Sequence, residues 1–586
     1  MGFLAPNTAD VDLQQWRSRP YQQRIRPLAE HWTLHGFGTP GIVHLLYLVK
    51  ITAYALGGIA VVSATPGVGG IADFGSWWAE PIVYQKLVIW TLLWEVLGLG
   101  CGSGPLSSHF LPPVGAFLHW LRPGTVRLPP WPGRIPFTAG TRRTVADVVL
   151  YAALLMAAVW LLCSPGEPAG SGDPGASGVL APWRIAVVAA LLALLGLRDK
   201  TVFLAARAEH YGLTLVVFLF PVSDMTAALK LVMLALWWGA ASSKLNRHFP
   251  FVVAVMISNS PLRPAWFKRR LYRHCPDDLR PSAFAAAAAH GGTVIEYVVP
   301  LVLVLSHGGP VTTIALAVMV VFHLHIMSTF PMGVPLEWNV FFIYSALVLF
   351  GHDAGVGAFA LHSPVLAAVL VSSLAVVPLL GHVRPDLVSF LPSMRYYAGN
   401  WATSLWCFRK GTERRLGEHV VKASALPVDQ LTRLYGADAA ELVLHQGLAW
   451  RAMHSHGRAL AGLLPRAVDD VESYDVRDGE TVAGAVLGWN FGDGHLHNEQ
   501  LVAAVQQRCD FAPGDLRVVV LESQPTHRQR QHYRIVDAAS GLIEEGHVNV
   551  GEMVTRQPWL DDESPAIPVE PVARPRPVTE AAAAHE

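Results

Sequence analysis

The chain has 586 residues, of which 52% are hydrophobic and only 15% are charged, and its formal net charge is zero. Soluble proteins carry about 25% charged residues, so the composition indicates an integral membrane protein, and the neutral charge argues against a general nucleic-acid-binding protein. The five cysteines are scattered without metal or redox spacing, so we expect neither a disulfide framework nor a cysteine zinc site.

Residues 1–40 are polar, with four arginines between positions 17 and 26, and they lack the pattern of a signal peptide. We expect them to form a basic cytoplasmic arm. Residues 41–383 hold a series of apolar runs, and a helix needs about 20 apolar residues to cross a bilayer. The runs predict about ten transmembrane helices. Their ranges are 41–64, 82–101, 144–164, 183–197, 211–221, 225–243, 284–306, 310–330, 335–351 and 360–381. The fifth run is short, and whether it crosses the membrane stays open.

Basic residues gather in alternate loops of this series. Arginines crowd residues 17–26, 122–143, 198–207, 263–280 and 409–415, whereas the loops between them carry acidic residues and almost no lysine or arginine. Loops rich in lysine and arginine stay on the cytoplasmic side of a membrane. The pattern therefore predicts a multi-pass protein of the plasma (inner) membrane with both termini in the cytoplasm.

The chain changes character after residue 383. Residues 384–408 keep many aromatic side chains, which is typical of a connector at the membrane interface. Residues 409–562 are expected to form a small cytoplasmic α+β domain, with a helical pattern through 427–464. Its strands are predicted near residues 515–522, 531–538 and 542–550, with a turn at 537–541 between the last two. Residues 563–586 are rich in Pro and Ala and predict a disordered tail. The fold class is thus an all-α polytopic membrane bundle with a small C-terminal α+β domain.

Ionisable side chains inside the spans are costly in lipid and usually face the protein interior or water. Two of them have simple structural explanations: Lys50 could pair with Glu95, and Asp147 suits the start of a helix. Glu296 lies in the middle of a span, so it should be protonated or paired. Lys244 ends the apolar run 225–243, where it is either an anchor that reaches for headgroups or a functional amine.

His323 and His325 lie late in a span, two residues apart. Residues with this spacing point about 200° apart on a helix, so they should not share a metal ion. We expect one of them to reach Glu296 or a lysine of a neighbouring span, or else to be a hydrogen-bonded structural histidine. Residues 331–335 then break the chain with prolines and a glycine. Glu337, Trp338 and Asn339 follow this break, and together with His325 and Lys230 they are candidates for binding a substrate.

Three motifs between residues 225 and 345 occur in a familiar order. They are a helix end at Lys244-Leu245, a Glu-x-x-x-Pro helix at Glu296–Pro300, and a histidine, phenylalanine and glycine at His323, Phe330 and Gly333. Together they resemble the vitamin-K-dependent carboxylase superfamily, which also holds the horizontally transferred transmembrane domain proteins. The whole chain is also similar to an uncharacterised actinobacterial family of transmembrane proteins.

The resemblance implies that Lys244 is a base that deprotonates a reduced quinone, and that Glu296 and His323 share its cavity. A quinone or naphthoquinol would then be the cofactor. A lysine desolvated near lipid is a sensible base, because burial favours the neutral amine. The carboxylase carries a large extracytoplasmic β-rich domain, whereas the domain predicted here is smaller and cytoplasmic.

The predicted cytoplasmic domain has a glycine-rich loop with Asp493, His495 and His497. Carboxylate and imidazole groups suit zinc or iron, so the loop is a weak candidate for a metal site, and the alternative is a capped loop with surface histidines.

Two main hypotheses follow for the whole chain. The first is a membrane-embedded enzyme that acts on a quinone or another lipid-soluble substrate, with Lys244, Glu296 and His323 as catalytic residues. The second is a transporter or lipid-handling protein without catalytic activity, whose intramembrane charges line a path. A membrane scaffold for a cytoplasmic protein partner is a further alternative. In each case the lipid bilayer is the surrounding medium.

Overall fold

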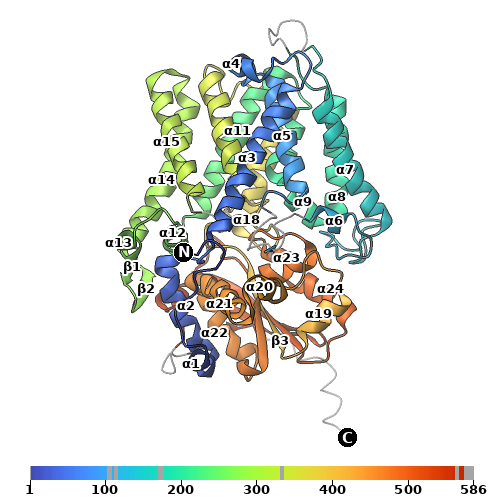
Figure 1. Cartoon of the computed structure of the whole chain (residues 1–586). Coiled ribbons are helices and arrows are strands. Elements are labelled where there is room, and N and C mark those ends of the chain that lie inside the picture. Colours follow the sequence, from blue (N-terminus) through green and yellow to red (C-terminus); the bar gives the residue numbers. More distant parts are fainter. Residues whose placement is uncertain are drawn as a thin grey trace.

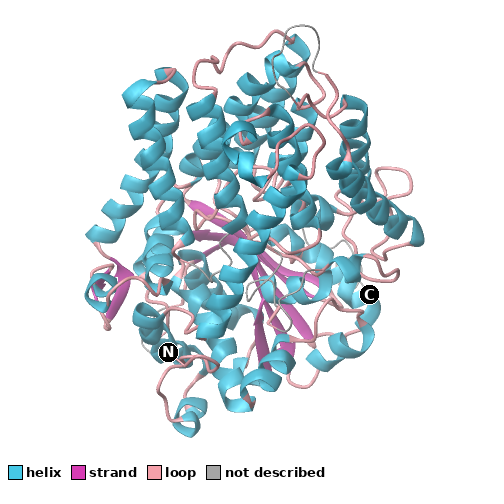
Figure 2. Cartoon of the chain, turned by 45° about the horizontal axis from the view of Figure 1, so that its top comes forward, coloured by secondary structure: helices cyan, strands magenta, loops and turns pink. Residues whose placement is uncertain are grey.

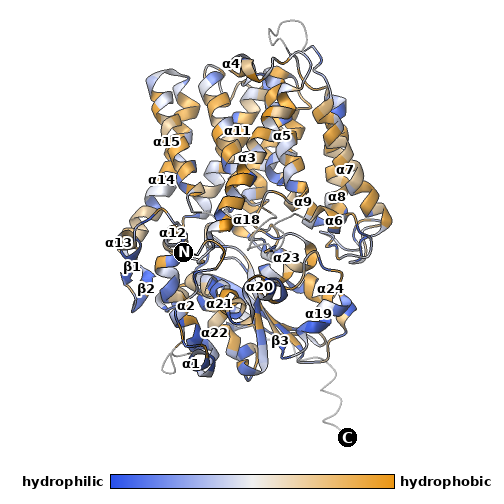
Figure 3. Ribbon diagram, in the orientation of Figure 1, coloured by the Kyte–Doolittle hydropathy of each residue, from blue (hydrophilic) through white to orange (hydrophobic). Residues whose placement is uncertain are grey.

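A bundle of helices that lie side by side sits above a C-terminal domain of helices and strands (Figures 1 and 2). That domain contains most of the strands. The structure is a computed structural model, and it describes residues 2–101, 109–110, 116–168, 177–329, 336–560 and 566–572. Hydrophobic residues predominate in the upper helices, and hydrophilic residues are more frequent in the domain below (Figure 3). This division fits a membrane bundle that carries a domain outside the bilayer.

In the part of the chain that the structure describes, six helical segments are long and apolar enough to cross a membrane. They are α3 (Gly41–Ser63), α7 (Val145–Cys163), α11 (Val222–Ser243), α14 (Ala283–Ser306), α15 (Gly309–Met327) and the continuous run of α17 (Pro364–Val371), η5 (Ser372–Val376) and α18 (Val377–Val383). The expected count of about ten spans is therefore not confirmed.

The other four predicted spans correspond to shorter or broken helices. They are α5 (Pro81–Val96), α8 (Pro182–Arg198), α16 (Leu336–Ala346) with η4 (Leu347–His352), and the series α9 (Lys200–Ala205), η3 (Ala208–Gly212) and α10 (Leu213–Val217). The series is interrupted at Arg207, whose φ of +51° is left-handed. The predicted range 211–221 holds only the end of η3 and the five residues of α10, which alone are too short to cross.

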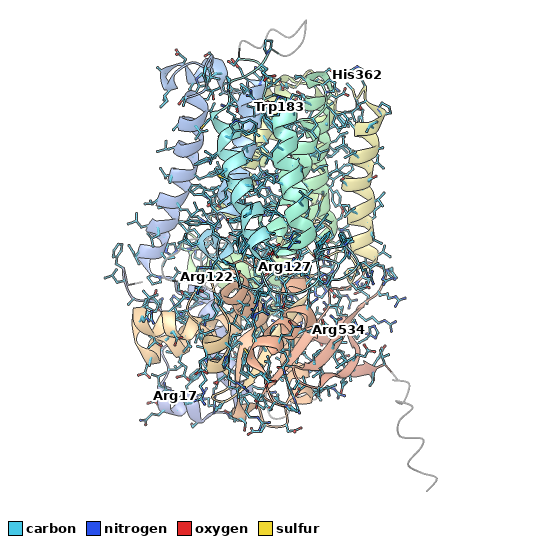
Figure 4. The ribbon with its side chains drawn as sticks, turned by 90° about the vertical axis from the view of Figure 1, so that its right-hand side faces the viewer. Arg17, Arg122, Arg127, Trp183, His362 and Arg534 are labelled. Atoms are coloured by element: carbon cyan, nitrogen blue, oxygen red, sulfur yellow. The ribbon has the colours of Figure 1, made fainter. Side chains whose placement is uncertain are left out.

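Contacts show where this broken segment begins and ends. Lys200 Nζ, at its start, donates to the backbone carbonyl of His495 in the C-terminal domain at 2.7 Å. Asp224 follows its end and accepts a hydrogen bond from the ring of His362 at 2.8 Å. Figure 4 places His362 at the end of the bundle opposite the domain, whereas Arg122 and Arg127 lie beside the domain. Residues 200–221 therefore run the length of the bundle.

The C-terminal domain is built on a six-stranded antiparallel sheet in the order β4-β3-β5-β6-β7-β8. The strands are β3 (Thr403–Arg409), β4 (Tyr474–Asp478), β5 (Leu516–Leu521), β6 (Arg530–Asp537), β7 (Gly541–Asn549) and β8 (Val569–Pro571). The three predicted strands are confirmed as β5, β6 and β7. The predicted turn between the last two is confirmed as well, because the Asp537 carboxylate accepts the N–H groups of Ala539 and Ser540, and Gly541 has a φ of +86°.

Both faces of this sheet are covered. Leu405 and Val519 lie on the face that packs against α22, whereas Trp406 and Val518 belong to the core that continues into the membrane bundle. The helices of the domain are α19 (Glu413–His419), α20 (Pro427–Tyr435), α21 (Ala437–Met453), α22 (Ser455–Ala467), η6 (Val471–Ser473), α23 (Gly479–Leu487), η7 (Gly494–Leu496), α24 (Glu499–Cys509) and α25 (Val550–Thr555). The helical pattern predicted for residues 427–464 is confirmed.

Two boundaries of this domain differ from the prediction. The strand β3 begins at Thr403, inside the range expected to be an interfacial connector. It is buried on both faces, so its sequence lacks the alternation that marks a half-buried strand. The strand β8 lies inside the range expected to be a disordered tail, where it pairs with the edge of β7.

The N-terminal arm is folded onto the domain. Its helices α1 (Leu13–Ser18) and α2 (Tyr21–His35) lie beside α21. Arg17 pairs with Glu441 at 2.6 Å, and Arg24 pairs with Glu472 at 2.8 Å. The arm and the C-terminal domain therefore lie at the same end of the bundle.

Small elements fill both ends of the bundle. On the domain side they are α6 (Phe117–Trp120), α12 (Phe249–Asn259), α13 (Ala265–Arg269), β1 (Tyr272–His274) and β2 (Asp278–Pro281), and at the opposite end they are η1 (Ile71–Asp73) and α4 (Phe74–Trp77).

The loop around His495 joins the domain to the bundle through the Lys200 contact and also carries a largely buried ion pair. His495 Nε2 lies 3.0 Å from a carboxylate oxygen of Glu522. Burial alone lowers the pKa of His495, but the Glu522 carboxylate outweighs it, so the pKa is raised. Burial raises the pKa of Glu522, and the His495 charge outweighs that and lowers it to about 2.

We predict that His495→Gln destabilises the protein by about 3 kcal/mol at pH 6, because it leaves a buried carboxylate without its partner. A raised histidine pKa contributes stability below its unfolded value of about 6.5, and that stability is lost as pH rises through the folded value. The stability that the ionised Glu522 carboxylate contributes is lost as pH falls from about 4.5 toward 2. Unfolding free energies of wild type and variant should therefore differ most between about pH 4.5 and 6.5.

The measurement is denaturation of the solubilised protein across a pH series. His419→Gln on the exposed face of α19 is the matched control and should change little. If the difference in unfolding free energy between wild type and His495→Gln stayed constant from pH 5 to pH 9, it would contradict a charged pair.

Candidate functional site

A cavity of about 250 Å³ lies where the membrane bundle meets the C-terminal domain. Its walls come from α11, α12, α14, α15 and α16, and it is closed by Tyr396 and Tyr397 of the connector and by Phe491 of the domain. Most of the lining side chains are apolar. Membrane helices and domain therefore build the chamber jointly.

Six of the candidate residues line this cavity, and the fold brings them together from four elements. They are Lys244, Glu296, His323, His325, Trp338 and Asn339.

Lys244 and Glu296 form a buried ion pair in the wall. Lys244 follows directly after α11, and Glu296 lies in the middle of α14. The Lys244 ammonium contacts both carboxylate oxygens, with Oε1 at 2.5 Å, and the two side chains are 10% and 4% exposed. The ring of Phe249 lies 5.3 Å from Nζ. The amine thus points into the protein, so it does not reach out to the headgroups.

His323 is held by hydrogen bonds on both sides of its ring. The indole N–H of Trp237 donates to Nε2 at 3.1 Å, and Nδ1 lies 2.8 Å from Asn339 Oδ1. An indole can only donate, so Nε2 carries no proton and Nδ1–H donates to Asn339. His323 is therefore a neutral imidazole in a fixed tautomer. It fits the alternative expectation of a hydrogen-bonded structural histidine, because its two hydrogen bonds go to neither Lys244 nor Glu296.

His325 points elsewhere, as the helical spacing predicts. Its Nδ1 accepts a hydrogen bond from Arg263 at 2.9 Å. Within the described part of the chain, no group of three His, Cys, Asp or Glu side chains is arranged to hold a metal ion.

Two further candidates lie outside the cavity. Glu337 pairs with Lys50 at 2.9 Å, so the expected pair of Lys50 with Glu95 is wrong. Glu95 instead accepts the backbone N–H of Cys101 at 3.1 Å. Spacing along the chain could not show that α16 lies against α3. Lys230 donates to the backbone carbonyl of Asp353 at 3.0 Å. It lies about four helical turns before Lys244 along α11, so it is not beside that residue.

The three weak metal candidates have separate partners. Asp493 accepts a hydrogen bond from Ser389 at 2.8 Å, and His495 pairs with Glu522. His497 Nδ1 lies 2.6 Å from the Ser404 hydroxyl. The glycine-rich loop is therefore tied into the domain by contacts between protein groups. Phe330 and Gly333, two residues of the third motif, lie outside the described residues.

Sequence reasoning missed several residues of the chamber. Trp237 and Phe249 contact the polar groups, but an aromatic residue in an apolar run gives no signal of its own. The Arg207 guanidinium stacks on the ring of Trp338 at 3.8 Å. Arg207 itself was not missed, because it belongs to the arginine-rich range 198–207, but the sequence could not show that it contacts Trp338.

The cavity reaches the lateral surface of the bundle. Ala288 of α14 lines the cavity and is exposed, and Gly292, one turn further along α14, is half-buried. Because α14 is one of the six long apolar helices, its exposed side faces lipid. Ala288 therefore places one edge of the cavity at an exposed face of a helix that is long and apolar enough to cross a membrane.

The fold and this chamber define a polytopic membrane protein with an internal site shared between its helices and an attached domain. The chain belongs to the family described as "Transmembrane protein of unknown function (DUF3556)", whose model matches residues 1–571. This match confirms the prediction of a multi-pass membrane protein. It also spans the arm, the bundle and the domain together. It shows neither a likeness to the carboxylase superfamily nor an actinobacterial source. No curated protein and no solved structure matched the chain.

We predict that Glu296→Gln destabilises the protein by about 3–5 kcal/mol, because it leaves the Lys244 ammonium buried without a counter-charge. Adding Lys244→Met should restore most of the loss. The thermal unfolding of Glu296→Gln, Lys244→Met and the double variant, compared with wild type, measures this coupling as a double-mutant cycle. Asp386→Asn, which removes the exposed pair with Arg384, is the control and should have no measurable effect. A Glu296→Gln variant as stable as wild type would show that the pair is not buried.

Proposed function

We propose that this protein binds a lipid-soluble molecule in the cavity and acts on it as a membrane-embedded enzyme with Lys244 as its base. The observation that carries the proposal is the Lys244–Glu296 pair in the wall of a mostly apolar chamber whose lining includes the exposed Ala288. An apolar body fits the walls of such a chamber, and a polar head would meet the ion pair.

The pair offers a route for a proton. The ammonium can pass a proton to the Glu296 carboxylate along their hydrogen bond, which leaves a neutral amine. The amine then takes the proton of an acidic substrate hydroxyl, and the resulting oxyanion lies beside the re-formed ammonium. The charges balance, because one proton has moved from the substrate to Glu296. His323, whose ring nitrogens are both in use, would position Asn339 and Trp237.

A quinol is the substrate class that the motif resemblance favours. Its hydroxyl groups are acidic enough to lose a proton to an amine, and its ring and apolar tail match the lining. In support of this proposal, Lys244, Glu296 and His323, which carry the matching motifs, all line one cavity.

A lipid-handling protein without catalysis is the second candidate. The exposed Ala288 in the cavity lining favours it, since a carrier also needs a path between its cavity and the bilayer. The two candidates agree on binding and differ on the role of Lys244.

We predict that a quinone or polyprenyl lipid co-purifies with the protein and that Ala288→Trp reduces its amount at least fivefold by blocking entry at this edge of the cavity. Ala287→Trp is the matched control, because Ala287 is an exposed neighbour on α14 that does not line the cavity. Mass spectrometry of lipid extracts gives the readout. Equal lipid content in the two variants would argue against entry at Ala288.

The role of Lys244 is tested by its substitution with alanine and with arginine. Arginine keeps the charge but cannot give up a proton. If Lys244 is a base, both variants should lose at least 100-fold in the protein-dependent aerobic oxidation of a reduced naphthoquinone, followed by absorbance. A fully active Lys244→Arg variant would overturn Lys244 as the base, whereas a wild-type protein that does not accelerate the oxidation would favour the lipid-handling candidate.

We further propose ten crossings with both termini in the cytoplasm, because the basic loops lie on the domain side. In a variant with Cys163 and Cys275 replaced by serine, His362→Cys should react with an impermeant maleimide in intact cells. His274→Cys should react only after permeabilisation. The two histidine side chains are equally exposed, at 77% and 78%. The reverse labelling pattern would show that the domain and both termini lie outside the cytoplasm.

A further inference from the structure

The segment between α12 and α14 projects from the side of the bundle at the level of the domain (Figure 1). It contains α13 and the hairpin of β1 and β2, and it leads directly into α14. Lys268 anchors it, because its ammonium donates to the carbonyl of Leu34 in α2 at 2.8 Å. The segment is therefore a fixed platform at the point where a membrane helix begins.

Large apolar side chains of this platform are exposed. Leu262 is 72% exposed, Trp266 is 61% exposed and Phe284 is 43% exposed. Phe284 is the second residue of α14, and the ring of Phe267 packs against it at 5.5 Å. Tryptophan at the end of a membrane helix is typical of the headgroup region, and exposed phenylalanine and leucine are typical of segments that lie in the membrane interface. These side chains therefore lie at the boundary between water and hydrocarbon.

Three arginines of the same platform line a shallow hollow of about 580 Å³. They are Arg269, Arg270 and Arg273, and they are exposed. Within the described ranges, none of their guanidinium nitrogens lies within 4 Å of a carboxylate. Asp277 of the hairpin faces His274 and Arg26 instead, at 3.5 Å and 4.0 Å.

The other carboxylate of the hairpin is also in use. Asp278 pairs with Arg280 at 2.5 Å and accepts a hydrogen bond from Gln557. The hollow therefore keeps three positive charges that no acidic side chain of the hairpin neutralises.

We propose that this hollow binds the phosphate of an anionic phospholipid from the domain-side leaflet. Guanidinium groups match phosphate oxygens in bidentate geometry. Leu262, Trp266 and Phe284 would lie along the glycerol and the upper acyl chains, which a soluble phosphate compound lacks. The combination of three guanidinium groups with an apolar rim selects a lipid, and it stands independently of the function of the cavity.

The experiment is a titration of the purified full-length protein with phosphatidylglycerol and with phosphatidylcholine, followed by native mass spectrometry. The test variant is Arg269→Gln with Arg273→Gln. Arg270 is left in place because its guanidinium lies 5.7 Å from the Trp266 ring. Wild type should prefer phosphatidylglycerol, and the double variant should bind it about 25-fold more weakly, since one arginine near the surface contributes about a factor of five.

The matched control is Arg414→Gln with Arg433→Gln, which removes the same charge from exposed arginines of the C-terminal domain. It should leave phosphatidylglycerol binding unchanged. Should the double variant fail to fold, Arg273→Gln alone, in the exposed hairpin, is expected to lose about fivefold.

Unchanged phosphatidylglycerol binding in the test variant would overturn the proposal, and so would an equal loss in the control. A second arm adds inorganic phosphate or glycerol phosphate at millimolar concentration. Full displacement of the lipid by these compounds would show that the hollow is a site for free phosphate. That result would also overturn the proposal. Leu262→Ala with Trp266→Ala should weaken binding of the lipid and leave any binding of inorganic phosphate unchanged.

Discussion

The candidate site depends on one interaction, the ion pair between Lys244 and Glu296. An isolated charge in the hydrocarbon region is very costly, so each group needs the other as long as both are charged. The pair joins the end of α11 to the middle of α14 and thereby fixes one wall of the cavity. A buried ion pair often contributes little net stability compared with apolar side chains of the same size. Its presence in a mostly apolar wall therefore favours a chemical or binding role.

The domain is part of the same chamber. Tyr396 and Tyr397 of the connector and Phe491 of the domain complete the lining, and Trp338 links the lining to the Arg207 guanidinium. The family match over residues 1–571 includes all of these parts. Neither the bundle nor the domain alone therefore encloses the cavity.

The sequence located the polar site residues because an ionisable group in an apolar run is conspicuous. Lys244, Glu296 and His323 were found in this way. It could not identify their partners, which depend on the helices that pack together. Lys50 therefore meets Glu337 in place of Glu95, and His323 meets Trp237 and Asn339. The short strands β5, β6 and β7 were predictable from alternation and a turn, whereas β3 is buried on both faces and shows no alternation. Apolar lining residues such as Phe249 and Ala288 carry no signal until the cavity is known.

The most direct measurement is a cryo-electron microscopy map of the full-length protein extracted with its native lipids in nanodiscs. The expected result is an elongated density in the cavity, with its polar end within hydrogen-bond distance of the Lys244 amine or the Glu296 carboxylate. A map that places the amine among the lipid headgroups, with Glu296 turned to a different neighbour, would contradict the shared chamber and the function proposed for it.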